Sequence, residues 1–291
     1  MLLTAFLKEG TAALEPLYPS SEARSLLLML CEAQLGVQRH TPILEPSYEI
    51  PSGRLLSLLA ALERLKKGEP VQYVLGFSEF MGRRFRVSPA VLIPRPETEQ
   101  LVMAAVDILR GLPRGARVLD LCTGSGCIAW SLALEVPGTS VVGVDISQEA
   151  LQVARSQDFP LDAGAQAPVF VQADVLAPAA QPFPFGPFDL IVSNPPYILE
   201  AEKAQMRRNV LDFEPPIALF VPDSDPLVFY QSVAAWSGRL LVPGGTGLVE
   251  INETLGAATA ELFSSAGFSD VRQMKDFFDK DRFVGFRKSA S

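Results

Sequence analysis

The sequence holds few of the residues from which metal sites and disulfide frameworks are built. Its 291 residues include three cysteines and one histidine. Cys122 and Cys127 stand five positions apart in a glycine-rich stretch, a spacing that matches no common zinc-binding pattern. Most zinc sites and disulfide scaffolds are therefore excluded, and we expect no metal. Free thiols fit a reducing compartment, so we expect a cytoplasmic protein.

Basic residues are also in short supply. Lys and Arg number 25 against 33 Asp and Glu, which leaves a formal net charge of -8. Proteins that hold nucleic acid do so largely through Lys and Arg on the phosphates, so the composition argues against a stable complex with nucleic acid. No apolar stretch is long enough to cross a bilayer, which argues against a membrane protein.

What the sequence does contain divides into three regions. Residues 1–70 carry leucines at helical spacing, broken by prolines, and predict a small N-terminal helical domain. Residues 71–93 are rich in β-forming side chains punctuated by glycine and proline, and predict a β-hairpin linker. Residues 94–291 alternate strands with helices, which predicts an α/β domain whose mostly parallel sheet is covered on both faces.

The third region can be divided into elements by its patterns. Strands are expected at 117–121, 140–146, 169–173, 188–193 and 247–251, and helices at 128–135, 148–156, 226–240 and 253–266. Two late strands near 270–274 and 282–287 have no long helix between them, so we expect an antiparallel hairpin at one edge of the sheet. The proline-rich segment 176–187 predicts a loop.

Polar residues stand at the ends of four successive predicted strands. The glycine-rich turn Cys122-Thr123-Gly124-Ser125-Gly126 follows the first strand, and Asp145, Asp174 and Asn194 mark the ends of the next three. Open α/β sheets bind ligands at this edge, where glycines expose backbone N–H groups and a carboxylate can accept from ribose hydroxyls. A nucleoside cofactor is predicted. These features alone do not separate a nicotinamide cofactor from S-adenosylmethionine, although Ala129 replaces the third glycine of the dinucleotide fingerprint.

The segment Asn194-Pro195-Pro196-Tyr197 directly follows the fourth strand. Consecutive prolines have fixed φ and no N–H, so the chain must leave the sheet as a stiff loop. The Asn194 side-chain oxygen and the Pro195 carbonyl can accept both N–H bonds of one NH₂ group, while the Tyr197 ring can stack on a planar amide or base. We predict methyl transfer to a weakly nucleophilic amide nitrogen, with Asn194, Pro195 and Tyr197 catalytic and all four residues binding the substrate.

Further stretches carry a resemblance to a known family. Gly-Glu-Pro-Val-Gln-Tyr-Val-Leu-Gly at 68–76, Val-Leu-Ile-Pro-Arg-Pro-Glu-Thr-Glu at 91–99, Phe-Glu-Pro-Pro-Ile-Ala-Leu at 213–219 and Asp-Arg-Phe at 281–283 accompany the Asn-Pro-Pro-Tyr segment. Together they resemble the PrmC (HemK) family, the glutamine methyltransferases of class-1 peptide-chain release factors. Three positions depart from the family pattern: Cys122 replaces a common glycine, Pro226 stands in Asp-Gly-Leu, and Asn252 stands in Glu-Ile-Gly.

The resemblance implies a fold, a reaction and a set of site residues. The fold is a seven-stranded Rossmann-like class I methyltransferase domain, preceded by the helical domain, which would grip the substrate protein. S-adenosyl-L-methionine would methylate the side-chain amide of the glutamine in the Gly-Gly-Gln loop of the release factor. By position, the cofactor would be lined by Cys122, Thr123, Gly124, Ser125, Gly126, Asp145, Asp174, Val175 and Asn194. The glutamine would be held by Asn194, Pro195, Pro196 and Tyr197.

Other functions share some of these features. DNA adenine methyltransferases carry the same tetrapeptide but need a basic DNA-contacting region, which this acidic chain lacks. A glutamine methyltransferase of a ribosomal protein is excluded less firmly. A catalytically silent binding protein is disfavoured by the intact turn and tetrapeptide. A nicotinamide oxidoreductase lacks both the third glycine and a catalytic His or Tyr-Lys pair. Arg95 and Glu214 are expected to pair structurally rather than to act on the substrate.

Overall fold

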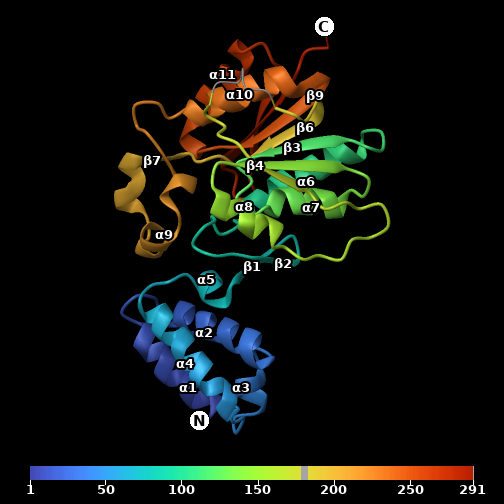
Figure 1. Cartoon of the computed structure of the whole chain (residues 1–291). Helices are drawn as coiled ribbons and strands as arrows, with labels where there is room; N and C mark the ends of the chain where they lie inside the picture. Colours follow the sequence, from blue (N-terminus) through green and yellow to red (C-terminus); the bar gives the residue numbers. More distant parts are fainter. Residues whose placement is uncertain (178–182, 291) are drawn as a thin grey trace. The chain divides into compact units, whose positions relative to one another are not determined.

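The computed structural model describes residues 1–177 and 183–290 (Figure 1). Part of the predicted proline-rich loop, residues 178–182, lies outside the described residues. The chain forms two compact units. One comprises Met1–Phe77 and Met206–Phe213, and the other comprises Ser78–Gln205 and Glu214–Ser291. The short second piece of the first unit, which the sequence patterns did not indicate, is inserted between two segments of the second unit.

The first unit is helical, and leucines form its core. Its helices are α1 (Leu3–Leu14), α2 (Ser20–Leu35), α3 (Thr41–Leu44), α4 (Ser52–Lys66), α5 (Val71–Leu75) and, from the inserted piece, α9 (Arg208–Phe213). The core is built mainly by apolar side chains repeating along α1, α2 and α4, including Leu3, Leu7, Leu27, Leu30, Leu58 and Leu65. The helical spacing of leucines over residues 1–70 therefore predicted this part of the fold correctly.

The expectation that residue 71 begins a strand-rich segment was wrong for its first five residues, which form α5. Pro70 precedes the helix, and Gly76 ends it in the left-handed conformation at φ 79°. The helix buries Val71 and Val74, three positions apart, in the core of the first unit. Burial on a helical face and well-formed ends outweigh the β-propensity of the residues. The expected hairpin follows as β1 (Phe77–Phe80) and β2 (Arg83–Arg86).

The second unit is built on a seven-stranded sheet. Its strands are β3 (Arg117–Leu121), β4 (Ser140–Asp145), β5 (Val169–Gln172), β6 (Phe188–Ser193), β9 (Leu241–Glu250), β10 (Ser269–Lys275) and β11 (Asp281–Arg287). They lie in the order β10-β11-β9-β6-β3-β4-β5. The first five are parallel, whereas β11 runs antiparallel to both β9 and β10. The predicted parallel sheet with an antiparallel hairpin at one edge is confirmed.

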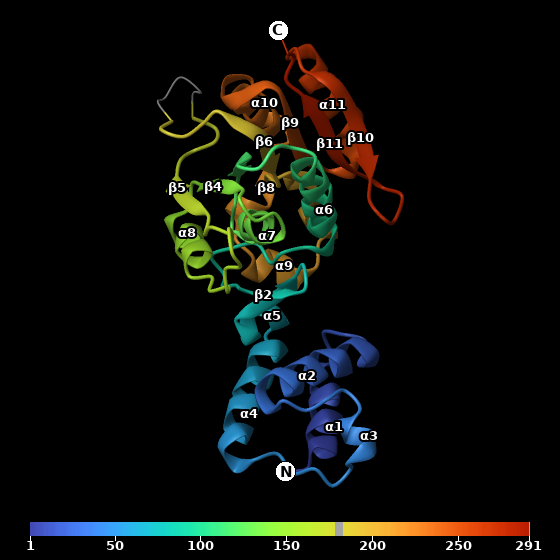
Figure 2. The same cartoon turned by 90° about the vertical axis from the view of Figure 1, so that its right-hand side faces the viewer.

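Helices cover both faces of this sheet (Figures 1 and 2). One face carries α6 (Pro96–Arg110), α7 (Cys127–Glu135) and α8 (Gln148–Arg155), and the other carries α10 (Val228–Leu240) and α11 (Gly256–Ser265). Shorter elements are β7 (Ile198–Leu199), β8 (Phe220–Val221), and the 3₁₀ turns Glu200–Gln205, Pro216–Ala218 and Glu253–Leu255. The sequence patterns missed α6, although Pro96 and acidic residues in its first turn are typical of a helix start.

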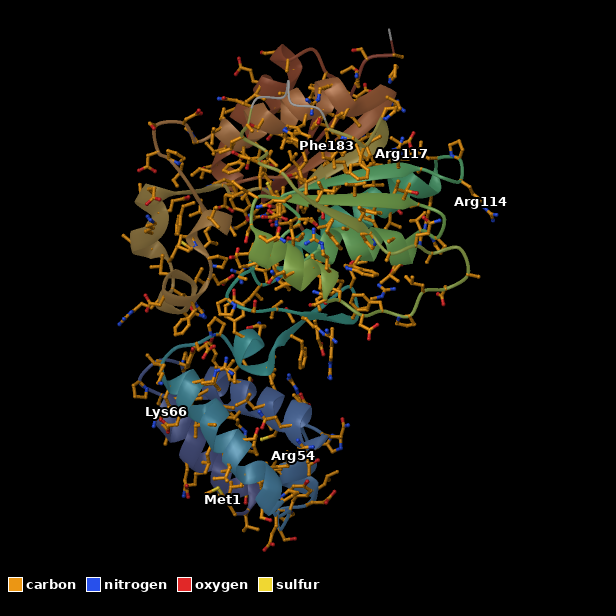
Figure 3. All side chains as sticks on the ribbon, viewed as in Figure 1. Met1, Arg54, Lys66, Arg114, Arg117 and Phe183 are labelled. Atoms are coloured by element: carbon orange, nitrogen blue, oxygen red, sulfur yellow. The ribbon has the colours of Figure 1, made fainter. Side chains whose placement is uncertain are left out.

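Successive residues of the central strands pack on opposite faces of the sheet. Val118 of β3 joins the core beneath α6, α7 and α8, while Leu119 joins the core beneath α10 and α11. Leu190 and Ile191 of β6 divide in the same way. Side chains fill the space between the sheet and its helices (Figure 3). This alternation holds the central strands in register, so that their carboxyl ends meet at one edge.

No helix in the described parts of the chain is both long enough and apolar enough to cross a membrane.

Gly247 of β9 gives the sheet a test of its packing. A Cβ atom there would lie 2.0 Å from Cζ of Phe286, its partner on β11. The Phe286 ring is buried and stacks on Phe263 with a centroid separation of 3.9 Å, so it has no room to move. We expect Gly247→Ala to lower the free energy of unfolding by about 1–3 kcal/mol in denaturant titrations.

Gly238 in α10 provides the control. A Cβ atom added there meets nothing within 4 Å. Gly238→Ala should leave stability unchanged or raise it by up to about 1 kcal/mol, because alanine favours a helix interior. Equal effects of the two substitutions would contradict the packing argument.

Candidate active site

A cavity opens at the carboxyl ends of β3, β4 and β6 and beside the turn after β5. Its walls come from the stretches 90–98, 122–128, 145–150, 174–176 and 217–218, and from Asn194, Pro196 and Phe229. Eight of the nine residues predicted to line the cofactor do line this cavity, namely Cys122, Thr123, Gly124, Ser125, Asp145, Asp174, Val175 and Asn194. The ninth, Gly126, lies behind the wall, against Phe170 and Ala154.

The glycine-rich turn has the backbone that its sequence requires. Gly124 and Gly126 have φ values of 52° and 77°, in the region that glycine occupies without strain. A Cβ atom at Gly126 would lie 2.9 Å from the Phe170 ring, so this position also needs glycine for space. Cys122, where the family pattern has glycine, adopts a φ of 62°. Positive φ values are disfavoured for residues with a side chain, which explains why glycine is common at this position.

Asp145 ties the turn to the end of β4. Its carboxylate accepts the backbone N–H of Gly124 at 2.8 Å and that of Ser147 at 2.9 Å. Burial raises the pKa of this carboxyl group. Two N–H bonds leave part of the acceptor capacity of a carboxylate unused, and Asp145 lines the cavity. It is therefore placed to accept from the hydroxyls of a ribose.

Asp174 and Val175 form the wall after β5. Asp174 accepts the backbone N–H of Leu176 at 2.8 Å. The Val175 side chain is buried, and its carbonyl accepts the indole N–H of Trp236 at 3.1 Å. These bonds fix the backbone immediately before the undescribed segment 178–182 and give the cavity an apolar wall at Val175.

Asp120 supports the turn from inside β3, a role that the sequence reading missed. Its Oδ2 accepts the hydroxyl of Thr123 at 2.6 Å and the backbone N–H of Ala129 at 3.2 Å. The side chain is fully buried, and burial raises its pKa to about 7. The signal was present in the sequence, because a charged residue inside an apolar strand needs hydrogen-bond partners.

Asn194 lines the cavity, and its amide nitrogen is bound to a buried side chain of the protein. Its Nδ2 donates to Oγ1 of Thr98 at 3.0 Å, and that hydroxyl donates to Oε2 of Glu250 at 2.8 Å. Within the described residues, the Asn194 Oδ1 and the Pro195 carbonyl accept no hydrogen bond. Asn194 lines the cavity, whereas Pro195 is buried and is not among the residues of the cavity wall. Sequence reasoning did not find Thr98 or Glu250, which lie behind Asn194.

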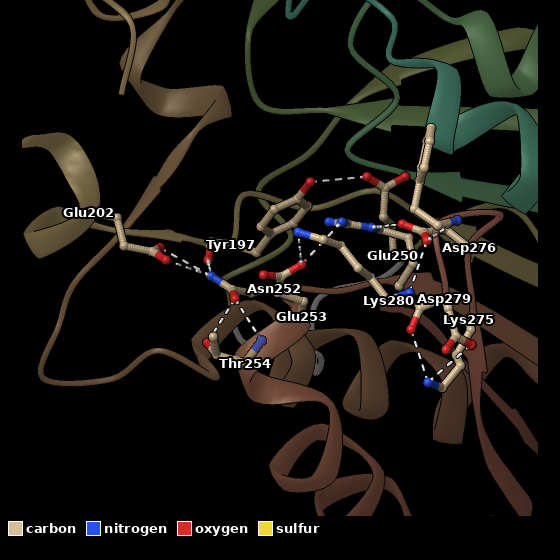
Figure 4. Close-up of polar contacts among 12 residues, drawn as sticks. Tyr197, Glu202, Glu250, Asn252, Glu253, Thr254, Lys275, Asp276, Asp279 and Lys280 are labelled. Atoms are coloured by element: carbon tan, nitrogen blue, oxygen red, sulfur yellow. Dashed lines mark hydrogen bonds and ion pairs between the residues drawn. The ribbon is translucent and has the colours of Figure 1, made fainter. Parts of the chain in front are cut away.

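Tyr197 does not line the cavity. Its ring packs against the core beneath α10 and α11, and its hydroxyl donates to Oε1 of Glu250 at 3.1 Å (Figure 4). The amide of Asn252 donates to the Tyr197 carbonyl at 3.3 Å and to Glu202 at 3.1 Å. Asn252, a departure from the family pattern, therefore helps to hold the end of the tetrapeptide loop.

The pairing expected for Arg95 and Glu214 is present. Their closest side-chain atoms are 2.6 Å apart, and the Glu214 side chain is buried. Glu214 also accepts the backbone N–H of Ile93 at 3.1 Å. The pair fixes the segment that leads into α6, and Arg95 contributes to the cavity wall as well.

No group of three or more His, Cys, Asp or Glu side chains that could hold a metal ion is present among residues 1–177 and 183–290.

Comparison with known proteins places the chain in a family. Residues 5–76 match the PrmC N-terminal domain, and residues 100–212 match the methyltransferase small domain. A release factor glutamine methyltransferase of Bacteroides thetaiotaomicron is 42% identical over 282 residues, which cover 97% of this chain and 98% of that protein. The chain belongs to the release factor glutamine methyltransferase family.

Other proteins of the same activity match over between 70% and 98% of this chain. The Flavobacterium psychrophilum protein is 34% identical over 98% of both chains, and that of Chlorobaculum tepidum is 39% identical over 85% of this chain and 84% of its own. A solved release-factor-specific protein-(glutamine-N5) methyltransferase of Alicyclobacillus acidocaldarius is 32% identical over 70% of this chain and 99% of its own, with a TM-score of 0.43. The resemblance drawn from the sequence is confirmed, and the chain is a methyltransferase.

The position of Asp145 predicts its effect on cofactor binding. Asp145→Ala removes the proposed ribose acceptor and the anchor of Gly124, so we expect the Kd for S-adenosylmethionine to rise about 10- to 100-fold. Asp145→Asn keeps one acceptor oxygen and should lose less. Calorimetric titration measures both. Asp162→Ala, at an exposed loop position, is the control. An unchanged Kd in Asp145→Ala would remove this residue from the cofactor site.

Proposed function

We propose that this enzyme transfers the methyl group of S-adenosyl-L-methionine to the side-chain amide nitrogen of the glutamine in the Gly-Gly-Gln loop of class-1 peptide-chain release factors. The observation that carries the proposal is the geometry of Asn194, whose nitrogen is held by Thr98 while its oxygen remains unpaired at the cavity. Membership of the family supports the choice of substrate.

The cavity fits the proposed methyl donor. Asp145 offers carboxylate oxygens to a ribose, the turn 122–126 offers backbone N–H groups, and Val175 offers an apolar surface for a base. Asp174 adds a carboxylate to the same cavity, which suits a ligand that carries positive charge. When bound, S-adenosylmethionine supplies a methyl group on a positively charged sulfur.

The protein's part in the reaction is to hold one flat amide. The Asn194 Oδ1 and the Pro195 carbonyl accept its two N–H bonds, which orients the nitrogen and stabilises the positive charge that develops on it. No charged base is needed before transfer, since the extra proton can leave afterwards. Pro195 and Pro196 are buried and have fixed φ, so the two acceptors keep their spacing.

Tyr197 completes the proposed substrate site. Its hydroxyl is held by Glu250 and its carbonyl by Asn252, so the loop is fixed at its far end. In this structure the Tyr197 ring packs against the core and does not line the cavity. We propose that the ring comes to lie beside the glutamine amide when the release-factor loop is bound.

Two other substrates remain alternatives to test. A ribosomal protein would present a glutamine amide of the same chemistry, and a DNA adenine would present an exocyclic NH₂. The net charge of -8 disfavours DNA. We further propose that the enzyme acts in the cytoplasm, with release factors as partners and without stable binding to nucleic acid or membranes.

The substrate is tested by incubating the purified enzyme with labelled methyl donor and one of four acceptors. These are a release factor, the same factor with its loop glutamine changed to alanine, ribosomal proteins, and duplex DNA. We expect label only in the intact release factor. Equal labelling of the alanine variant would place the methyl group elsewhere, and labelling of ribosomal protein or DNA alone would replace the proposed substrate.

Asn194 is tested by substitution. Asn194→Ala removes one of the two acceptors, so methyl transfer should fall by at least about 100-fold, while calorimetry should show cofactor affinity within about threefold of the unaltered enzyme. Asn194→Asp keeps an acceptor oxygen and should retain more activity than the alanine variant. Parallel loss of transfer and cofactor binding in Asn194→Ala would refute this division of roles.

A further inference from the structure

Side chains from three separate segments of the sequence meet behind the tetrapeptide loop. Thr98 comes from α6, Glu250 from the end of β9, and Asn194 and Tyr197 from the loop after β6. The links are Asn194 to Thr98 at 3.0 Å, Thr98 to Glu250 at 2.8 Å, and Tyr197 to Glu250 at 3.1 Å. Thr98 and Glu250 are 2% and 1% exposed, so water cannot replace these partners.

The direction of each bond follows from the number of available protons. An ionised carboxylate only accepts, so an ionised Glu250 must receive the single hydroxyl proton of Thr98. The Thr98 oxygen then has only lone pairs left for Asn194, and it must face the NH₂ end of the amide. The Asn194 oxygen is thereby directed to the cavity. Neither the rotamer of Asn194 nor its own chemistry would make this choice.

We propose that Thr98 and Glu250 are positioning residues that set which end of the Asn194 amide faces the substrate, and that protonation of Glu250 releases this orientation. The inference rests on the proposed function and deepens it, because it names the groups that keep the catalytic acceptor an acceptor.

Protonation of Glu250 allows the donor and acceptor roles along these hydrogen bonds to be reversed. A proton on Oε2 of Glu250 can be donated to Thr98, whose own proton is then free to point at Asn194. The amide can turn and place its oxygen on Thr98, which leaves its NH₂ group facing the cavity. Two NH₂ groups would then oppose each other at the substrate, where neither accepts. The enzyme in this state keeps its fold and loses an acceptor.

Several titratable or charged groups face Glu250 from the surrounding elements. They are Glu97 on α6, Cys127 on α7, Tyr197 after β6, Tyr230 on α10 and Arg282 on β11. Burial raises the pKa of Glu250 to about 7, and the bonds from Thr98 and Tyr197 and the charge of Arg282 counter part of this rise. The ionised form therefore gains population as the pH rises through about 7. Transfer should strengthen over the same interval and weaken below it.

The first test uses substitutions that keep the shape of the side chain but change the hydrogen bond between Thr98 and Glu250. Thr98→Val removes the hydroxyl, and Glu250→Gln imitates the neutral acid. Both should lower kcat by about 10- to 100-fold, with a smaller change in the Kd for S-adenosylmethionine. Thr98→Ser keeps the hydroxyl and should recover most of the loss. A Thr98→Val enzyme with unaltered kcat would overturn the proposal.

Thr259 offers a matched control in α11. It is also a fully buried threonine, and its hydroxyl has no hydrogen-bond partner in the part of the chain that the structure describes. Thr259→Val makes the same chemical change away from the site and should leave kcat and its pH dependence unaltered. A similar loss of kcat in Thr259→Val would mean that the effect of Thr98→Val reflects general damage to the core.

The second test is the pH dependence of kcat, which a merely structural role would not move. The unaltered enzyme should lose activity about tenfold per pH unit below its midpoint near 7, as expected for one essential ionised group. Glu250→Gln has no such group at this position, so its lower activity should not show this limb. The same acidic limb in Glu250→Gln would overturn the proposal.

A third measurement needs no protein substrate. In enzyme labelled with ¹⁵N, the Asn194 side-chain NH₂ signal is assigned by its absence from Asn194→Asp. Its shift should follow a single titration in the unaltered enzyme and should not do so in Glu250→Gln. A signal that does not change with pH in the unaltered enzyme would refute the proposed link from Glu250 through Thr98 to Asn194. If no release factor is methylated at any pH, the proposed function fails. The Asn194 signal still tests whether Glu250 controls the orientation of the Asn194 amide.

Discussion

One buried carboxylate, which only accepts hydrogen bonds when it is ionised, organises the surroundings of the active site. Glu250 takes a hydroxyl proton from Thr98 on one side and from Tyr197 on the other. Thr98 in turn accepts the amide N–H of Asn194. Both ends of the tetrapeptide loop are therefore linked to Glu250 by hydrogen bonds. The two buried prolines between them have no freedom in φ. In the proposed arrangement, buried side chains behind the loop set the orientation of the Asn194 amide.

The sequence stretches without an obvious chemical role acquire a physical one in this arrangement. Glu214, from the stretch 213–219, holds Ile93 and Arg95 at the start of the cavity wall. Asn252 holds the loop carbonyl at Tyr197. Arg282 lies close enough to Glu250 to favour its ionised form. These three residues from distant stretches therefore act near one site, where Glu214 restrains the cavity wall and Asn252 restrains the tetrapeptide.

The sequence predicted the sheet well because each strand of the parallel core carries its own apolar pattern. Once the strands are predicted, the positions of the ends of β3, β4, β5 and β6 are predicted as well. Most of the cavity residues that the sequence indicated lie at these ends. The helix α5 was mistaken for strand because its β-branched residues bury in a helical core, which depends on contacts outside the segment. The bonds of Thr98 and Glu250 could not be predicted, because 152 positions separate these residues and nothing local marks the contact. The bond from the Tyr197 hydroxyl to Glu250 is also long-range, and nothing local marks it.

The inserted piece Met206–Phe213 changes how the helical unit is attached. The backbone passes between the two units at three places, after Phe77, after Gln205 and after Phe213. Two of these junctions lie just downstream of Tyr197, in the same connection that leaves β6. A domain joined to the rest of the chain at one junction can be removed by a single truncation. The helical unit is joined at three junctions, two of which lie inside the catalytic unit's sequence. Deleting the residues before Ser78 would therefore leave Met206–Phe213, the remaining piece of the helical unit, inside the catalytic chain.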